Sequence, residues 1–341
     1  MLKGEWRVVS MGDAGMDQEL SHQTVESSAW SLLRCPETRL PVSLVQEGER
    51  RCVAADEQHR YRVTASGIPL FAEHKLSAAS LAQQKHYDAI AEQYNVNLGY
   101  PHTRVYTAYL DQQMQALLDT LSAGRALGRC VELCCGAGEA VQLLGQRMQL
   151  GVGVDISISM LERGRKKSPQ DNLFFVQGDA TSVPLVDECA DYVFMFGGIH
   201  HVPNRQVLFN EVFRVLKPGG YFVFREPVSD FWLWRCIRAL IYRISPLLDH
   251  DTERPLRFDE TVPLLRNSGF QDEVTWRTYG FLGFCLFMNS DVLWFNRFFR
   301  FIPGISGLTA MATRVDHWCT RQTRLQRAGL QVVASVRKPL V

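Results

Sequence analysis

The 341-residue sequence predicts an α/β fold with a doubly wound sheet, in which helices cover both faces of mostly parallel strands. Three observations support this prediction. A strand ending at Leu133 runs into a glycine-containing turn and then into a helix from Glu139 to Met148. A second strand, Leu150 to Val154, follows directly and ends in Asp155. Short apolar runs then alternate with helical segments up to residue 227, as expected of successive strand–helix units.

The turn after the first strand has the composition of a ligand-binding loop. Gly136 and Gly138 have no Cβ, so the backbone there can approach a ligand closely. Asp155 follows Gly138 by seventeen residues, where a doubly wound sheet places an acid that binds ribose hydroxyls. These residues alone leave a nicotinamide-dependent enzyme open as an alternative. However, the third glycine of G-x-G-x-x-G is absent, because Val141 stands there.

The later strands also end in polar or glycine-rich loops. The elements expected after Asp155 are a strand over 174–178, a strand over 191–196, a helix over 206–216 and strands over 221–226, 272–279 and 329–337, with a helix over 259–267. Asp179 and Ala180 follow the third strand, and Phe196 and Gly197 end the fourth.

These motifs, in this order over residues 126–227, resemble the class I S-adenosylmethionine-dependent methyltransferases, in particular the ubiquinone and menaquinone C-methyltransferases. The shared pattern is an acid and a glycine triplet after strand one, an acid after strand two, Gly-Asp-Ala after strand three and Leu-Lys-Pro-Gly-Gly before strand five. The resemblance implies a Rossmann-like sheet of seven strands and S-adenosyl-L-methionine as cofactor. One position departs from the pattern: Cys134 replaces the first glycine, which we expect only if its φ stays negative.

The resemblance also implies a set of cofactor-binding residues. In that arrangement Glu132 and the loop surround the methionine and ribose end, and Asp155 binds the ribose hydroxyls. Ile156 packs on adenine, Asp179 and Ala180 meet its edge, and Phe196 and Gly197 lie beside the methyl group. The Tyr87–Tyr94 segment resembles a lid over the cofactor, although the same spacing also forms the apolar face of a packed helix. The full set is Tyr87, Tyr94, Glu132, Cys134, Gly136, Gly138, Asp155, Ile156, Asp179, Ala180, Phe196 and Gly197.

Three residues are candidates for acid–base catalysis. His200 and His201 follow the fourth strand, and a histidine pKa near neutrality suits deprotonation of a phenol, enol or hydroxyl. Glu226, at the end of the fifth strand, is the third candidate. The alternative is structural, because a His-His-Val sequence in this branch commonly shapes the loop, and the glutamate then orients it.

Other functions are weighed against this prediction. A methyltransferase acting on RNA or on a translation factor is one alternative, and a non-catalytic module that only binds S-adenosylmethionine is another. The formal net charge of +1 gives no general attraction to nucleic acid, so no nucleic-acid partner is expected. Enzymes that methylate base amino groups typically carry an Asn/Asp-Pro-Pro-Tyr/Phe motif after strand four, whereas this chain has Phe196-Gly197-Gly198-Ile199. The expected acceptor is a small or lipid-like molecule, methylated at carbon or oxygen.

The sequence before the predicted sheet divides into three parts. Residues 1–26 form a predicted flexible leader, 27–75 a small β module, and 76–125 a helical lid before the 126–341 core. The module resembles a zinc-ribbon-like family whose members partner and activate methyltransferases. We expect it to hold no metal, because Thr38 stands where the second cysteine after Cys35 is required, and Cys52 and His59 are irregularly spaced.

Two aromatic-rich insertions, about 228–257 and 281–310, interrupt the core. They fit three alternatives: a buried cap, a lipid-like substrate pocket or membrane-surface face, and a homodimer interface. In the first insertion Arg235, Arg238 and Arg243 recur at helical spacing beside Trp232, which suits a helix facing anionic headgroups. No signal peptide or apolar run of spanning length is evident, and nine scattered cysteines show no disulfide pattern. We therefore expect a cytoplasmic protein, with peripheral membrane contact as one alternative.

Overall fold

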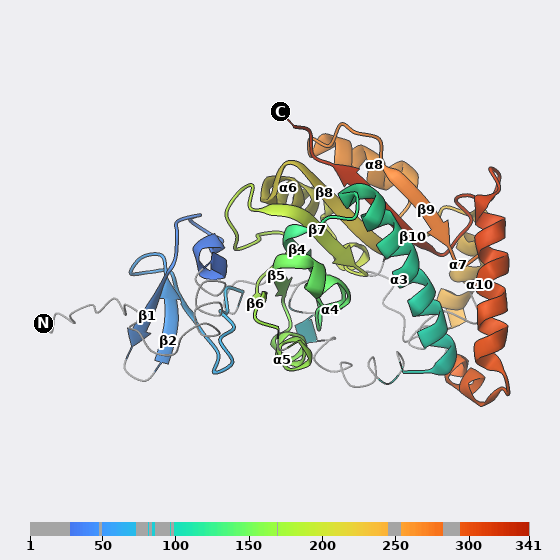
Figure 1. Cartoon of the computed structure of the whole chain (residues 1–341), viewed down its shortest axis with the longest axis horizontal. Coiled ribbons are helices and arrows are strands. Elements are labelled where there is room, and N and C mark those ends of the chain that lie inside the picture. The colour runs from blue at the N-terminus through green and yellow to red at the C-terminus, as the bar shows by residue number, and fades with distance from the viewer. Residues whose placement is uncertain are drawn as a thin grey trace, which may run out of the picture.

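A seven-stranded sheet forms the centre of the computed structural model, which describes residues 28–47, 50–72, 81, 84–85, 96, 99–168, 170–244, 254–281 and 294–340. The strand order is β6-β5-β4-β7-β8-β10-β9 (Figure 1). The strands are β4 (Gly128–Leu133), β5 (Met148–Asp155), β6 (Leu173–Gln177), β7 (Ala190–Phe196), β8 (Leu216–Pro227), β9 (Thr275–Tyr279) and β10 (Gln331–Arg337).

The central strands are parallel, and only β10 breaks the pattern, pairing antiparallel with both β8 and β9. Every residue of β6 is buried, because a parallel sheet covered on both faces needs apolar side chains on both. Helices α6 (Arg205–Val215) and α8 (Phe258–Asn267) cover one face, and α3 (Pro101–Ser122), α4 (Glu139–Leu144) and α5 (Ile158–Lys167) cover the other. The predicted doubly wound α/β fold is therefore confirmed.

One helix prediction was wrong in its extent. The helix expected to run from Glu139 to Met148 ends at Leu144, and a 3-10 turn over Gly145–Arg147 leads into β5. A Cβ at position 145 would lie 2.6 Å from the Gln170 side chain, so this glycine permits a close approach that ends the helix. Helix α10 (Ile305–Arg321) begins at the end of the expected insertion over 281–310 and runs on toward β10.

The predicted N-terminal β module is present as a three-stranded antiparallel sheet, β1 (Ser43–Glu47), β2 (Arg50–Ala54) and β3 (Arg60–Arg62). Its connection to the large sheet runs through the edge strand β6. The Phe71 N–H donates to the Gln177 carbonyl at 3.0 Å, and the Gln177 N–H donates to the Pro69 carbonyl at 2.9 Å. Side chains of the module also join the apolar core on the α6 face of the sheet. The proposed division of the chain into leader, module, lid and core stays a prediction.

Cys35 has protein partners inside the module. Its Sγ lies 3.1 Å from the Tyr61 hydroxyl and accepts a hydrogen bond from the Thr38 backbone N–H. Within the described residues, no group of three or more His, Cys, Asp or Glu side chains is placed to hold a metal ion. At the position where a zinc ribbon has its second cysteine, Thr38 instead donates a hydrogen bond to Cys35. The absence of metal stays a prediction.

The inserted segments include helix α7 (Trp232–Ile244) and the 3-10 helix η3 (Trp294–Phe301). No helix among the described residues is both long and apolar enough to cross a membrane. Tyr87 and Tyr94, which the sequence assigns to a lid, lie outside the described residues.

Candidate functional site

The loop after β4 adopts a backbone that bends at every second residue. Cys134, Gly136 and Gly138 have φ values of 49°, 52° and 86°, all in the left-handed region. The expectation of a negative φ at Cys134 was therefore wrong. A left-handed conformation costs a residue with a Cβ roughly 1–2 kcal/mol, so this loop carries strain that a glycine would avoid.

Glu132 holds the loop against the following helix. Its two carboxylate oxygens accept hydrogen bonds from the backbone N–H groups of Ala140 and Val141 at 2.8 and 3.0 Å. These groups belong to the first turn of α4, which has no partners for them within the helix. Burial raises the pKa of Glu132 to about 8, and the two N–H groups oppose that rise. The residue therefore shapes the cofactor loop through the backbone.

Asp155, at the end of β5, braces the same loop from the neighbouring strand. Its Oδ2 accepts from the Gly136 N–H at 2.8 Å, and its Oδ1 accepts from the Ser157 N–H at 2.8 Å. Ser157 in turn caps α5, because its side chain accepts from the Met160 N–H. Ile156 lies between them and is half-buried. The predicted ribose-binding acid and the glycine loop are thus brought together.

Asp179 and Ala180 follow β6 in a compact turn. The Asp179 Oδ1 accepts from the Thr181 N–H at 2.8 Å and from its hydroxyl at 2.6 Å. Ala180 is buried. The preceding Gln177 is fully buried and donates from its side chain to the Ile156 carbonyl, which ties this turn to the end of β5.

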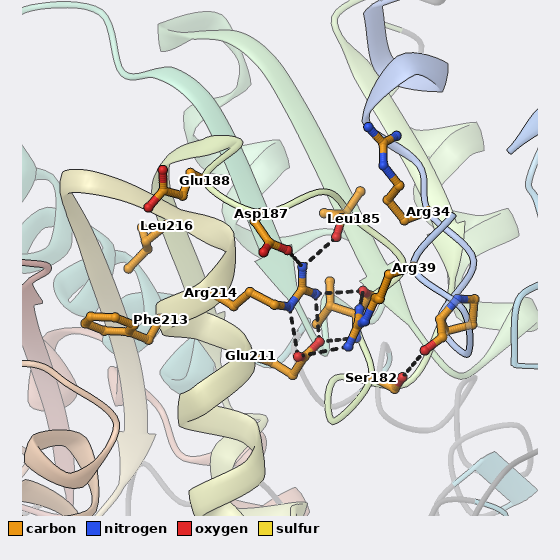
Figure 2. Close-up of polar contacts among 12 residues, drawn as sticks. Arg34, Arg39, Ser182, Leu185, Asp187, Glu188, Glu211, Phe213, Arg214 and Leu216 are labelled. Atoms are coloured by element: carbon orange, nitrogen blue, oxygen red, sulfur yellow. Dashed lines mark hydrogen bonds and ion pairs between the residues drawn. The ribbon is translucent and has the colours of Figure 1, made fainter. Parts of the chain in front are cut away.

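The segment just beyond this turn is fixed by a cluster of Arg39, Glu211 and Arg214, the arginine–glutamate cluster (Figure 2). Both arginines donate to the Val183 carbonyl at 2.9 Å, and the Val183 N–H donates to Glu211 at 2.7 Å. Arg214 also donates to the Leu185 carbonyl. Because Arg39 comes from the N-terminal module, residues 183–185 are held jointly by the module and by α6.

The charges of the site fit a cationic ligand. Burial raises the pKa of the Cys134 thiol well above its ordinary value, and the nearby acids Asp155 and Asp179 act in the same direction. The loops over 134–139, 155–159 and 179–182 contain no lysine or arginine. A dinucleotide would bring phosphates to this acidic surface, whereas S-adenosylmethionine has a positively charged sulfur and no phosphate. The donor set therefore fits S-adenosylmethionine.

Phe196 and Gly197 end β7 beside an arginine that the sequence analysis missed. The Arg225 guanidinium lies 4.7 Å from the Phe196 ring centroid and pairs with Asp111 at 2.7 Å and Glu139 at 2.9 Å. It thereby joins α3, α4 and β8. An arginine inside the apolar strand sequence Tyr-Phe-Val-Phe-Arg-Glu was the available signal, because burying such a charge requires partners.

The three candidate catalytic residues lie together. Glu226 is fully buried, and its Oε1 accepts from the N–H groups of Gly198 and Ile199 at 2.7 and 2.8 Å. Its Oε2 lies 2.8 Å from His200 Nδ1. The His201 ring packs on that of His200, with centroids 3.8 Å apart. Burial raises the pKa of Glu226 to about 7, and the N–H groups of Ile199 and Gly198 oppose that rise.

This pair has the geometry of a base and its orienting acid. With Nδ1–H donating to the Glu226 carboxylate, the other ring nitrogen, Nε2, is the unprotonated one and has the basic lone pair of the ring. Gly197, with a left-handed φ of 71°, places little bulk beside the His200 ring.

Comparison with known proteins identifies a related family. The family described as "Methyltransferase domain" matches residues 131–224. The chain is 27% identical over 194 residues to a demethylmenaquinone methyltransferase of Roseiflexus castenholzii, covering 52% of this chain and 81% of that protein. It is 37% identical over 102 residues to the enzyme of the same name in Staphylococcus aureus, covering 29% of this chain and 42% of that protein.

Among solved structures, the 4+2 cyclase SpnF shares the fold. Its TM-score is 0.53 at 18% identity, covering 78% of this chain and 98% of SpnF. Together, the matched family and the sheet topology show that residues 131–224 form a methyltransferase domain of the Rossmann-like, S-adenosylmethionine-dependent type.

Proposed function

We propose that the enzyme transfers a methyl group to carbon or oxygen of a small or lipid-like acceptor that carries an ionisable hydroxyl. The observation that carries this proposal is the His200–Glu226 pair at the carboxyl ends of β7 and β8. The names of the two relatives support an acceptor of the quinone type, in its reduced, phenolic form.

The proposed chemistry begins with proton removal. When bound, S-adenosylmethionine supplies a methyl group on a cationic sulfur that leaves as a neutral thioether. His200 Nε2 accepts the proton of the acceptor hydroxyl, and the resulting phenolate has increased electron density on oxygen and on the neighbouring ring carbon. Glu226 stabilises the imidazolium that forms, because its carboxylate accepts the Nδ1–H. The ring carbon attacks in a C-methylation, and its C–H proton is then lost; in an O-methylation the oxygen attacks directly.

The cofactor would be held by the residues that shape the loops. The left-handed turn at Gly136 and Gly138 admits a ligand close to the backbone, and Asp155 and Asp179 present carboxylates on the two neighbouring strands. Phe196 and Arg225 form an aromatic and cationic wall next to Gly197. Because Arg225 is neutralised by two acids, it adds no net charge that would repel the sulfonium.

A hydrophobic acceptor also suits the composition of the insertions. Helix α7 places Trp232 at the surface and Trp234 in the interior, where its indole N–H donates to the Ala328 carbonyl. A cytoplasmic location with peripheral contact to a membrane belongs to the same proposal, supported by eight free cysteines among the described residues. The membrane contact is developed below.

Calorimetry with S-adenosylmethionine and with NAD tests the cofactor part. We expect S-adenosylmethionine alone to bind, and Asp155→Ala to weaken it by about 1–3 kcal/mol, the scale of a lost charge-assisted hydrogen bond. Asp272→Ala, which changes an exposed acid in the connection between α8 and β9, is the matched control. Equal affinities of the two variants would show that Asp155 does not contact the ribose.

The acceptor part is tested with labelled S-adenosylmethionine and a panel of hydroquinones that differ in side-chain length. Transfer to a hydroquinone, lost in His200→Gln while cofactor affinity is retained, supports the proposal. Cofactor binding without transfer to any phenolic acceptor would contradict it.

A further inference from the structure

Half of the large apolar side chains that are exposed in the described part of the chain lie in one short stretch of sequence. These seven of fourteen residues lie between residues 298 and 318, on η3, on α10 and at Ile302 in the turn between them. Single exposed apolar residues are ordinary, but a contiguous group marks an interaction surface. We call this group the apolar face; its members are Phe298, Phe301, Ile302, Leu308, Met311, Val315 and Trp318.

Helix α10 exposes most of its large apolar side chains, whereas an ordinary packed helix buries them. Its large apolar side chains recur on successive turns of the outward side, with Met311 57% and Trp318 65% exposed. Apart from Ile305 in its first turn, the side that packs inward, against α3, is made of small and polar residues. These inward residues are Ile305, Thr309, Ala312, Thr313, Asp316 and Thr320. A helix that only covers the core would place leucine, methionine and tryptophan inward, so the outward side is arranged for a partner.

Charge selects the kind of partner. Over residues 294–321 the sequence has four arginines and one acid, and that acid, Asp316, is fully buried. Arg314 and Arg321 are exposed and lie about two helical turns apart, beside the apolar face. The Arg300 guanidinium lies 4.6 Å from the Phe301 ring centroid, so cations and aromatic rings are interleaved. Figure 1 shows α10 at the end of the molecule opposite the N-terminal module.

We propose that η3 and α10 form a docking surface for an anionic lipid bilayer. Exposed tryptophan and phenylalanine suit the interface between headgroups and acyl chains, and the arginines match anionic headgroups. A second copy of the chain fits less well. A two-fold interface would bring the apolar face against itself, placing arginine opposite arginine with no exposed acid on η3 or α10 to pair with them. This inference does not depend on the identity of the methyl acceptor.

Co-sedimentation of the full chain with vesicles tests the surface. We expect binding to vesicles of equal parts phosphatidylglycerol and phosphatidylcholine at low salt, and much weaker binding to pure phosphatidylcholine or at high salt. Replacing Arg314 and Arg321 by Gln together should lower the partition coefficient roughly 30-fold, which corresponds to about 1 kcal/mol for each arginine. Met311→Ser with Trp318→Ser should lower it roughly tenfold or more, because both side chains lose apolar burial in the interface.

Matched controls separate this surface from general effects. Arg266→Gln and Val207→Ser change an exposed arginine on α8 and an exposed valine on α6, and they should bind vesicles like the wild type. Calorimetry with S-adenosylmethionine shows that each variant is folded. The proposal is overturned if the wild type stays in the supernatant with anionic vesicles at low salt. It is also overturned if sedimentation velocity shows a dimer that Trp318→Ser converts to monomer while vesicle binding is absent.

Discussion

Replacing Glu226 by Gln is the sharpest test of the proposed catalytic pair, because the change keeps the shape and alters the protons. The Glu226 Oε1 accepts from two backbone N–H groups, so the Gln oxygen is expected to keep that position and its NH₂ group to face His200 Nδ1. An NH₂ group donates, so His200 must accept at Nδ1 and carry its proton on Nε2. The nitrogen proposed as the base is then blocked.

The same substitution has a calculable effect on stability. Moving the pKa of one carboxyl from 4.5 to about 7 on folding corresponds to about 3 kcal/mol. The folded pKa is the higher one, so the folded protein binds the proton more tightly, and stability is lost as the pH rises from about 4.5 to about 7. A glutamine at this position does not titrate. Relative to the wild type, the variant should therefore gain about 2.5 kcal/mol of unfolding free energy between pH 5 and pH 8.

Three measurements check this reasoning. Urea denaturation of both proteins at pH 5 and pH 8 gives the difference in unfolding free energy, with Glu273→Gln, an exposed glutamate, as control. Nitrogen-15 NMR of the histidine rings reports the tautomer of His200. Methyl transfer should fall by about 10²- to 10⁴-fold, with cofactor affinity unchanged. A stability difference that is the same at both pH values, or an unchanged His200 tautomer, would refute the argument.

Two further predictions concern the N-terminal module. Arg214→Ala should lower the free energy of unfolding by about 3 kcal/mol, because Arg214 is mostly buried and its loss leaves Glu211 poorly paired. Arg39→Ala should cost less than about 1 kcal/mol, because the Arg39 side chain is 40% exposed. Equal losses of the two variants in denaturation experiments would contradict the geometry of the cluster. Metal analysis of the purified protein should find zinc well below one equivalent, because Thr38 has no thiol and instead donates its backbone N–H to Cys35. Near-stoichiometric zinc that disappears in Cys35→Ser would show that the module binds metal.

The strands and the order of their terminal motifs could be predicted because each is a short apolar run bounded by glycine or acid. Strands β5 to β7 are almost fully buried, and such continuous apolar runs are typical of parallel strands covered on both faces. Asp155 and Asp179 could be placed because each lies at or just after the end of one of these strands. Helix α10 was missed for a physical reason. Its large apolar residues are exposed, whereas a prediction from hydrophobic periodicity assigns the apolar side of a helix to the core.

The partners of the site residues could not be predicted. Glu132 and Asp155 bind backbone N–H groups, which every residue has, so no sequence signal identifies which ones. Arg225 finds Asp111 across more than a hundred residues, which only the packing of α3 on the sheet decides. The left-handed φ of Cys134 contradicts the preference of its own residue type, and the next two residues donate their N–H groups to Val154 and Asp155 of the neighbouring strand.

The contact between the module and the edge strand has a consequence for how this chain folds. Unpaired edge strands are templates for aggregation, and here Pro69 and Phe71 occupy the backbone groups of Gln177 at the end of β6. The pairing spans more than a hundred residues, so the module leaves the ribosome long before its partner strand exists. Until β6 is synthesised, Leu33, Val53 and Phe71 cannot pack into the core that they share with the large sheet. When β6 is synthesised, the segment of the module that pairs with it already exists. A fragment that begins at residue 99 would lose this protection, so we expect it to aggregate during refolding where the full chain does not.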